Sequence, residues 1–118
     1  MTLLFTKPQR AKLHANWAAQ EAASSAGAPF DPQPVVKLFT PDAGATWLLA
    51  ALSPDERVAY GVADLGLGFV EAGEIDLQEL RALRGRLGLP VERDRWFKAD
   101  KALSGYLTQG REAGRLVA

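Results

Sequence analysis

The pair Glu92 and Asp94, separated by one residue, is the arrangement in this chain best suited to acid and base chemistry. Two nearby carboxylates can divide the roles of proton donor and proton acceptor when their surroundings separate their pKa values. On a strand, however, these two side chains share one face and Arg93 takes the other, as a charged edge strand or an arginine anchor also requires. We therefore favour a structural role for the pair and assign no catalytic residue to the chain.

The other parts of common active sites are missing from the sequence. The chain has no Cys and a single His, which excludes disulfides, thiolate nucleophiles and cysteine-ligated zinc. His14 lies on the flank of a predicted helix, where a structural role is favoured. Gly66 and Gly68 lack the third glycine, the following helix and the lysine of phosphate-binding loops. The sequence thus predicts no metal, no cofactor and no enzymatic activity.

Asp42 and Asp64 are two further acidic candidates. Asp42 follows Pro41 in a predicted turn, where an Asp side chain accepts hydrogen bonds from the backbone of its own loop. That loop offers too few oxygen ligands for a metal ion. An enzyme that uses Asp42, Asp64, Glu92 or Asp94 is therefore the least favoured of the functional hypotheses.

Charge is distributed unevenly along a chain whose net charge is zero. Residues 42–79 hold eight acids and one Arg, a net charge of −7, whereas residues 81–101 hold seven bases and three acids, a net charge of +4. A basic face suits a nucleic acid or an acidic protein, and an acidic face suits a basic partner. Alternatively, the two segments neutralise each other as neighbours through surface pairs worth about 0–1 kcal/mol each, and we favour this interpretation. The candidate binding residues are Arg81, Arg84, Arg86, Arg93, Arg95, Asp42 and Asp64.

The elements that must position these residues follow from apolar periodicity and turn residues. A first helix begins with Thr6 as its cap and Pro8 in its first turn, and Leu13 and Trp17 share one of its faces. Residues 22–34 are rich in Ser, Gly and Pro, which predicts a flexible loop. Three strands joined by short turns follow, at Val35 to Thr40, Thr46 to Leu52 and Val58 to Ala63. The middle strand is apolar on both faces and is expected at the centre of the sheet.

Four further elements are predicted in the second half of the chain. They are a glycine-shaped loop at 64–69, a short helix capped by Asp76 and ended by Gly85, a charged edge strand at 91–97, and a terminal helix after Asp100. Residues 110–118 are expected to form a frayed tail. Most aromatic side chains, Trp96 among them, are expected in the core. The predicted fold is α+β, an antiparallel sheet of about four strands with two or three packed helices.

Length and composition predict the general class of protein. The chain has 118 residues, 47% of them hydrophobic and 24% charged, which predicts a single domain over 1–118. Its longest apolar run, Trp47 to Leu52, is far shorter than the about 20 residues of a membrane span, and no signal pattern opens the sequence. We therefore expect a cytoplasmic protein with no membrane partner, and the sequence leaves its oligomeric state open.

Several short motifs, in the order in which they occur along the chain, resemble one bacterial family. They are Lys37-Leu38-Phe39-Thr40-Pro41-Asp42 with Thr46-Trp47, Asp64-Leu65-Gly66-Leu67-Gly68-Phe69, Leu77 to Leu80 with Arg84-Gly85, Leu87-Gly88-Leu89-Pro90, and Glu92-Arg93-Asp94. This set is similar to the domain-of-unknown-function family numbered 2958, over Leu3 to Tyr106. The resemblance implies an accessory protein of plasmids, phages and integrated mobile elements, with no assigned activity. The chain departs from the family pattern at Val70, Ala72 and Arg86, where Pro, Leu and Pro are common, so a binding surface shaped by these positions would differ in specificity.

Two functional hypotheses of different classes follow. The missing catalytic parts and the mobile-element resemblance favour a non-enzymatic binding module that blocks a host defence system through contact with a host-encoded or element-encoded protein. The alternative is a nucleic-acid-associated accessory protein that uses the local arginine patch, whose binding would weaken steeply with salt.

Overall fold

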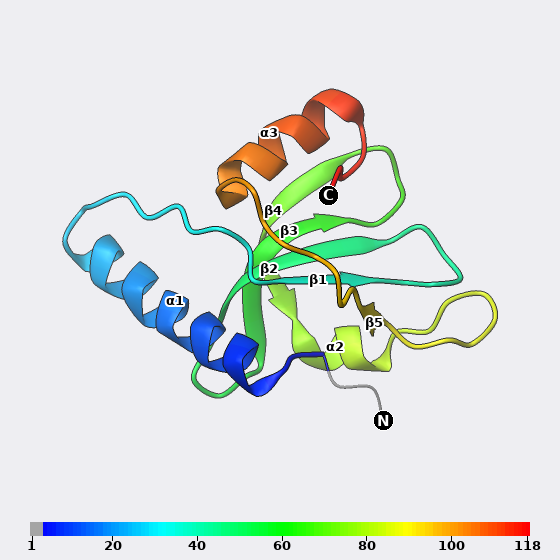
Figure 1. The fold of residues 1–118 in the computed structure, drawn as a ribbon, viewed down its shortest axis with the longest axis horizontal. Coiled ribbons are helices and arrows are strands. Elements are labelled where there is room, and N and C mark those ends of the chain that lie inside the picture. The colour runs from blue at the N-terminus through cyan, green and yellow to red at the C-terminus, as the bar shows by residue number, and fades with distance from the viewer. Residues whose placement is uncertain (1–3) are drawn as a thin grey trace.

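The computed structural model describes residues 4–118, which form one mixed sheet-and-helix fold (Figure 1). Its elements, in chain order, are α1 (Lys7–Ser25), β1 (Val36–Phe39), β2 (Thr46–Leu52), β3 (Val58–Asp64), β4 (Val70–Asp76), α2 (Leu77–Ala82), β5 (Glu92–Arg93) and α3 (Leu103–Ala113). The strands make one antiparallel sheet in the order β4-β3-β2-β1-β5. The predicted α+β fold and the central position of β2 are confirmed, although the sheet has five strands where about four were expected.

The first helix is longer than predicted, because its start is well capped and its second half is rich in Ala. The Thr6 hydroxyl accepts a hydrogen bond from the Gln9 backbone N–H, and the Gln9 side chain accepts one from the Thr6 N–H. Alanine has the highest helix propensity of all residues. The helix therefore continues to Ser25, so the predicted loop at 22–34 is wrong for its first four residues and 26–34 are the non-helical part.

The fourth strand was not predicted, because its residues have weak strand propensity. Glu71, Gly73 and Glu74 are residue types that strands use sparingly, and only Val70 among the seven residues of β4 is buried. The strand forms because it pairs with β3 along its whole length, from Val70 opposite Asp64 to its last residue. The predicted edge strand at 91–97, in contrast, shortens to the two residues of β5.

A β-bulge in β2 sets which face of the sheet each side chain occupies. The pairing with β3 shifts between Leu49 and Ala51, so Ala50 has no partner opposite it. The buried Asn16 of α1 donates its side-chain N–H to the Ala50 carbonyl oxygen, 2.8 Å away. After the bulge Leu52 returns to the side of Leu49, in the core cluster that also holds Leu13. One helix side chain thus fixes the irregular point of the central strand.

The sheet carries an apolar cluster on each face. One cluster includes Leu13 of α1 with Leu77 and Leu80 of α2. The other includes Leu103 and Tyr106 of α3. Successive strand residues face opposite sides, and Figure 1 shows α3 above the sheet with α1 and α2 below it. No described helix is long and apolar enough to cross a membrane.

The C-terminal segment is packed, and the predicted frayed tail at 110–118 is wrong. Helix α3 continues to Ala113, and Gly114 ends it in the left-handed conformation, with φ of 73°. Leu116 is buried, and its backbone N–H donates to Asp64 Oδ2 at 2.8 Å. The Asp64 carboxylate, 52 residues earlier in the chain, therefore anchors this end to the sheet.

Candidate functional site

Asp42 accepts hydrogen bonds from a distant loop, residues 83–91, whereas it was expected to accept them from its own turn. Its Oδ2 accepts hydrogen bonds from the backbone N–H groups of Leu87, at 2.6 Å, and Leu89, at 3.3 Å. The predicted role inside the β1–β2 turn belongs to Thr40, whose hydroxyl oxygen accepts from the Ala45 N–H at 2.9 Å. The Asp42 carboxylate therefore links the β1–β2 turn to loop 83–91.

Asp64, the second acidic candidate, is also a backbone anchor. It is buried, its Oδ1 accepts from the Gly66 N–H at 2.8 Å, and its Oδ2 accepts from the Leu116 N–H. Both carboxylates thus orient the chain around the β3–β4 loop and loop 83–91. Within residues 4–118, no three His, Asp or Glu side chains come together as a metal site.

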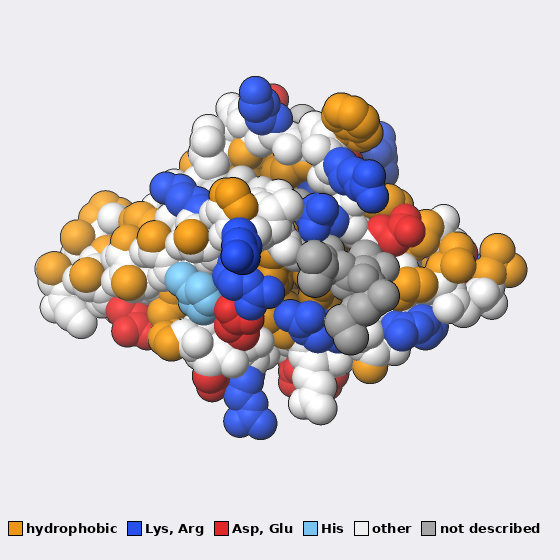
Figure 2. Space-filling view, turned by 60° about the horizontal axis from the view of Figure 1, so that its bottom comes forward, with side chains coloured by type: hydrophobic (Ala, Val, Ile, Leu, Met, Phe, Trp, Pro, Cys, Tyr) orange, Lys and Arg blue, Asp and Glu red, His pale blue; other side chains and the backbone are white. Residues whose placement is uncertain are grey.

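The five candidate arginines lie on two stretches of chain. Arg81 and Arg84 are on or just after α2, and the Arg84 Nη1 donates to the carbonyl oxygens of Arg81 and Leu83, so this side chain lies back along its own backbone. Arg93 is half-buried on β5, where it pairs with β1. The remaining two arginines, Arg86 and Arg95, are exposed. Figure 2 shows Lys and Arg side chains on one face as separate groups.

The acidic and basic segments take part in ion pairs with other parts of the chain. Glu56 pairs with Arg10 and with His14 Nε2, both on α1. These hydrogen bonds, that of Arg10 first, lower the pKa of the Glu56 carboxyl. Asp94 pairs with Lys37 of β1 at 3.5 Å. Helix α1 thus supplies part of the neutralisation that was expected from the basic segment.

Large hydrophobic side chains are exposed on two loops at one end of the sheet. Those on the β3–β4 loop are Leu65, Leu67 and Phe69, with exposed fractions of 55%, 68% and 51%, and those on loop 83–91 are Leu83, Leu87 and Leu89, with 39%, 80% and 43%. We call these six residues the apolar end. The β1–β2 turn lies between the two loops, because Asp42 binds one of them and a Cβ on Gly66 would lie 3.1 Å from the Gly44 carbonyl oxygen of the turn. Figure 2 shows hydrophobic side chains at the right-hand end of the molecule, where loop 83–91 projects in Figure 1.

A cavity of about 310 Å³ opens beside the apolar end. Leu65 and Leu83 line it from the two loops, and Trp47 and Leu80 line it from the core. Its remaining lining residues include three acids, Glu74, Asp76 and Glu79. Asp76 caps α2 by accepting from the N–H groups of residues 78 and 79. The side-chain carboxylates of Glu74 and Glu79, in contrast, make no hydrogen bond or ion pair within residues 4–118. The cavity, here called the acidic cavity, is thus apolar in its walls and negatively charged.

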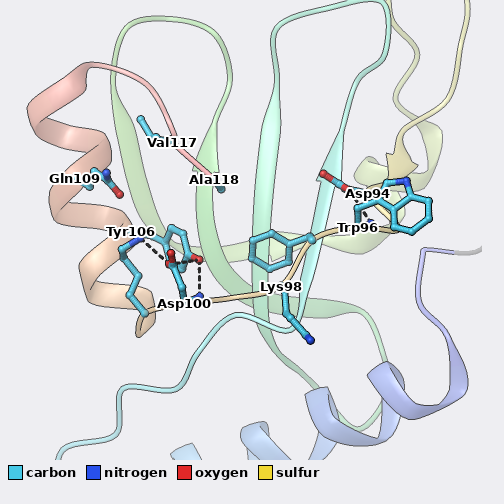
Figure 3. A pocket seen from close by; sticks show the side chains of 10 residues that line it. Asp94, Trp96, Lys98, Asp100, Tyr106, Gln109, Val117 and Ala118 are labelled. Atoms are coloured by element: carbon cyan, nitrogen blue, oxygen red, sulfur yellow. Dashed lines mark hydrogen bonds and ion pairs between the residues drawn. The ribbon is translucent and has the colours of Figure 1, made fainter.

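The expectation that most aromatic side chains lie in the core is wrong for Trp96, which is 91% exposed. It lines a second cavity, of about 470 Å³, together with the linker between β5 and α3, the α3 helix and the C-terminal segment (Figure 3). Phe97 and Tyr106 pack against each other here, with ring centroids 6.2 Å apart. Sequence reasoning missed this site because it treated Trp96 as apolar, although its place in a run of charged residues from Glu92 to Lys98 is a signal of exposure.

Comparison with known proteins gives one match. Residues 4–117 match the model of a family described as "Protein of unknown function (DUF2958)". No curated protein and no solved structure matches the chain. The match confirms the resemblance drawn from the sequence motifs, and the association with mobile elements stays a prediction.

Proposed function

We propose that this chain, which belongs to the DUF2958 family of proteins of unknown function, is a non-enzymatic module that binds a basic, amphipathic segment of a partner protein. The observation that carries the proposal is the apolar end with the acidic cavity beside it. Apolar side chains of the partner would enter the cavity, and its Lys or Arg side chains would meet the acids that line it.

The exposed hydrophobic residues support a protein partner. Single exposed hydrophobics are normal on soluble proteins, but larger contiguous patches mark interaction sites. The apolar end has six exposed hydrophobic side chains, on two loops that both contact the β1–β2 turn, and so differs from a single exposed hydrophobic residue. Leu87 illustrates the arrangement, because 80% of it is exposed while its backbone N–H is held by Asp42. The loop therefore presents its apolar side chain from a fixed backbone, which reduces the ordering cost of binding.

The acids of the cavity support a basic partner. The carboxylates of Glu74 and Glu79 are left without intramolecular partners in the described chain, and Asp76 adds a third negative charge. Complementary charges accelerate association and exclude partners of the same sign. We therefore expect binding to be weakened by salt, which shortens the range of charge interactions to about 8–10 Å at 0.1–0.15 M.

Two synthetic peptides test the proposal directly. The first is a fluorescently labelled 15-residue amphipathic helix of Leu and Lys, and the second replaces each Lys with Glu. In fluorescence anisotropy, we expect the Leu/Lys peptide to bind and the Leu/Glu peptide to bind at least about tenfold more weakly, because like charges across an interface cost several kcal/mol. Equal binding of both peptides would show non-specific hydrophobic adsorption and refute the proposal.

Matched variants locate the binding site. Leu87→Ser and Glu79→Lys should each weaken binding of the Leu/Lys peptide. Phe30→Ser and Glu112→Lys are the controls, since Phe30 is 37% exposed outside the apolar end and Glu112 is exposed on α3. A loss of affinity in the controls equal to that in the test variants contradicts the assignment of the surface.

The mobile-element association extends this proposal to a cellular role. The partner would be a host-encoded or element-encoded protein whose contact with this chain blocks a defence system. A strain that carries the protein should then protect an incoming plasmid or phage, and Leu87→Ser should lower that protection while Phe30→Ser does not. Equal survival with and without the protein would remove the defence role and leave peptide binding as the separate test of the module.

A nucleic-acid-associated role for Arg81, Arg84, Arg86, Arg93 and Arg95 stays a prediction as well. If these arginines bind phosphates, affinity for duplex DNA should fall steeply between 50 and 200 mM salt. The logarithm of the binding constant should fall with the logarithm of the salt concentration, with a slope of about −0.9 for each phosphate contacted. Binding that is absent or independent of salt would reject it.

A further inference from the structure

The side chain of Trp96 is held in an exposed position by a local turn. Asp94 Oδ1 accepts the Trp96 backbone N–H at 2.9 Å, and Asp94 Oδ2 lies 3.5 Å from the Lys37 Nζ of β1. The Phe97 N–H donates to the Asp94 carbonyl oxygen at 3.5 Å. The turn is therefore tied to the sheet, while 91% of Trp96 remains exposed to solvent. Burial of an aromatic side chain stabilises a protein, and the fold forgoes this stabilisation at Trp96.

The acidic side chains that line the cavity beside Trp96 are already hydrogen-bonded or ion-paired within the chain. Asp100 Oδ1 accepts from Lys101 Nζ at 2.7 Å and from the Tyr106 hydroxyl at 3.0 Å, and its backbone N–H donates to the same hydroxyl oxygen. The Lys101 ammonium also lies 4.3 Å from the centroid of the Tyr106 ring. With Asp94 bound as described, the polar lining side chains that make no hydrogen bond or ion pair within residues 4–118 are those of Trp96, Lys98 and Gln109.

The polar lining side chains without a partner in the described chain are thus an indole, an ammonium and an amide, and no acid is among them. Figure 3 shows Trp96 at one end of the linker and Asp100 with Tyr106 at the other, and Lys98 extends from the linker between them. Arg95, next to Trp96 in the chain, is exposed as well. An exposed indole ring that lines a cavity together with an exposed lysine suits a ligand with a flat ring and an anionic group. Gln109 adds an amide that can both donate and accept hydrogen bonds.

We propose that this cavity binds a nucleotide unit of a single-stranded nucleic acid, with the base stacked on Trp96 and a backbone phosphate at Lys98. Stacking on aromatic side chains together with a local cation is how proteins bind single strands without reading their sequence. The zero net charge of the chain limits the contact to the few phosphates that local cations reach. This site is separate from the apolar end and does not rest on the function proposed above.

Binding of labelled single strands tests the proposal. We would titrate the protein into fluorescently labelled oligothymidine and oligouridine of 12 nucleotides at several salt concentrations and measure anisotropy. Trp96→Ala should weaken binding about 5- to 100-fold, whereas Trp96→Phe should keep most of it, because a base stacks on either ring. Lys98→Ala should reduce the logarithmic salt slope by about 0.7, the contribution of one phosphate of a single strand. All variants are checked for an unchanged circular dichroism spectrum and melting temperature.

Matched controls are available on α1 and at the apolar end. Trp17→Phe changes a half-buried tryptophan that is bonded to Glu21, and Lys12→Ala removes an exposed cation from the same helix. Neither variant, nor Leu87→Ser, should change the affinity for the single strand. Unbound strands at 50 mM salt, an unchanged affinity of Trp96→Ala, or equal affinity for duplex DNA would overturn the proposal. Displacement of the strand by thymidine monophosphate at comparable concentration would also overturn it, in favour of a free nucleotide.

Discussion

A double-mutant cycle between Asp42 and Gly85 tests how loop 83–91 is held. A Cβ on Gly85 would lie 2.7 Å from Asp42 Oδ2 and closer still to the rest of the carboxylate, so Gly85→Ala must displace the side chain that binds the Leu87 and Leu89 N–H groups. The φ of Gly85 is outside the left-handed region, so the backbone itself accepts an alanine. In an Asp42→Ala background the obstacle is gone.

The two backgrounds should therefore give opposite signs. A hydrogen bond to a charged group contributes about 1.5–3 kcal/mol, and since the loop is exposed and water replaces part of this, we expect Gly85→Ala to destabilise the wild type by about 1–2 kcal/mol. In the Asp42→Ala background the same change should be neutral or stabilising by up to about 1 kcal/mol, because alanine restricts the unfolded chain. The coupling between the two positions is then about 1–3 kcal/mol, within the range of contacting residues.

Urea unfolding of the four proteins, followed by tryptophan fluorescence, measures the coupling. If the loop opens without unfolding the rest of the protein, urea unfolding does not detect the change, and hydrogen exchange of the Leu87 and Leu89 amides does. The protection factors of these two amides should fall by about 5- to 30-fold in Gly85→Ala. Gly73→Ala is the matched control, because a Cβ there meets nothing within 4 Å, and its effect should not depend on Asp42. An equal cost of Gly85→Ala in both backgrounds, by both measurements, would refute the assigned role of the carboxylate.

Three further predictions concern the packing of the sheet and its turn. Gly61→Ala should destabilise the protein by roughly 3 kcal/mol in urea unfolding, because a Cβ there would lie 2.9 Å from the Leu48 carbonyl carbon; a loss below 1 kcal/mol would contradict this close approach. Asn16→Ala should cost about 1–3 kcal/mol by leaving the bulged Ala50 carbonyl unbonded, and thermal unfolding measures it. The pKa of Glu56 is lowered from its usual 4.5, so its stabilising effect is present above that pH and is lost as the pH falls through the folded-state pKa. Stability measured from about pH 6 down to about pH 3 should therefore fall less in Glu56→Gln than in the wild type, and parallel curves would exclude this carboxylate as a cause of acid sensitivity.

The elements that were predicted well are those whose own residues determine them. The β2 strand spans Thr46–Leu52 as predicted, because its side chains are apolar on both faces and it must lie at the centre of the sheet. The short helix α2 likewise starts where Asp76 caps it. The β4 strand escaped prediction because Glu71 and Gly73 have little strand propensity of their own, and pairing with β3 determines their conformation.

The contacts of the candidate site residues could not be predicted from the sequence in the same way. The position of Asp42 in a turn was evident, but its partners are 45 and 47 residues away in the chain. Loop closure over such distances leaves no local pattern in the sequence. Trp96 shows the reverse error, because its residue type suggested burial and the fold exposes it. Hydrophobicity predicts that a side chain avoids water, and a functional surface is the place where that rule fails.

The uneven charge of the chain gains a different meaning once these contacts are considered together. Had the acidic segment been neutralised only by the basic segment, Glu56 would be expected to pair with a base of residues 81–101, yet it binds Arg10 and His14 of α1. Glu74 and Glu79 border an apolar cavity, and Lys98 borders an aromatic one. The zero net charge of the chain therefore conceals a difference in charged lining between the two cavities. It follows that Glu79→Lys should affect only peptide binding and Lys98→Ala only strand binding, and a loss of both activities in either variant would show that a single surface serves them.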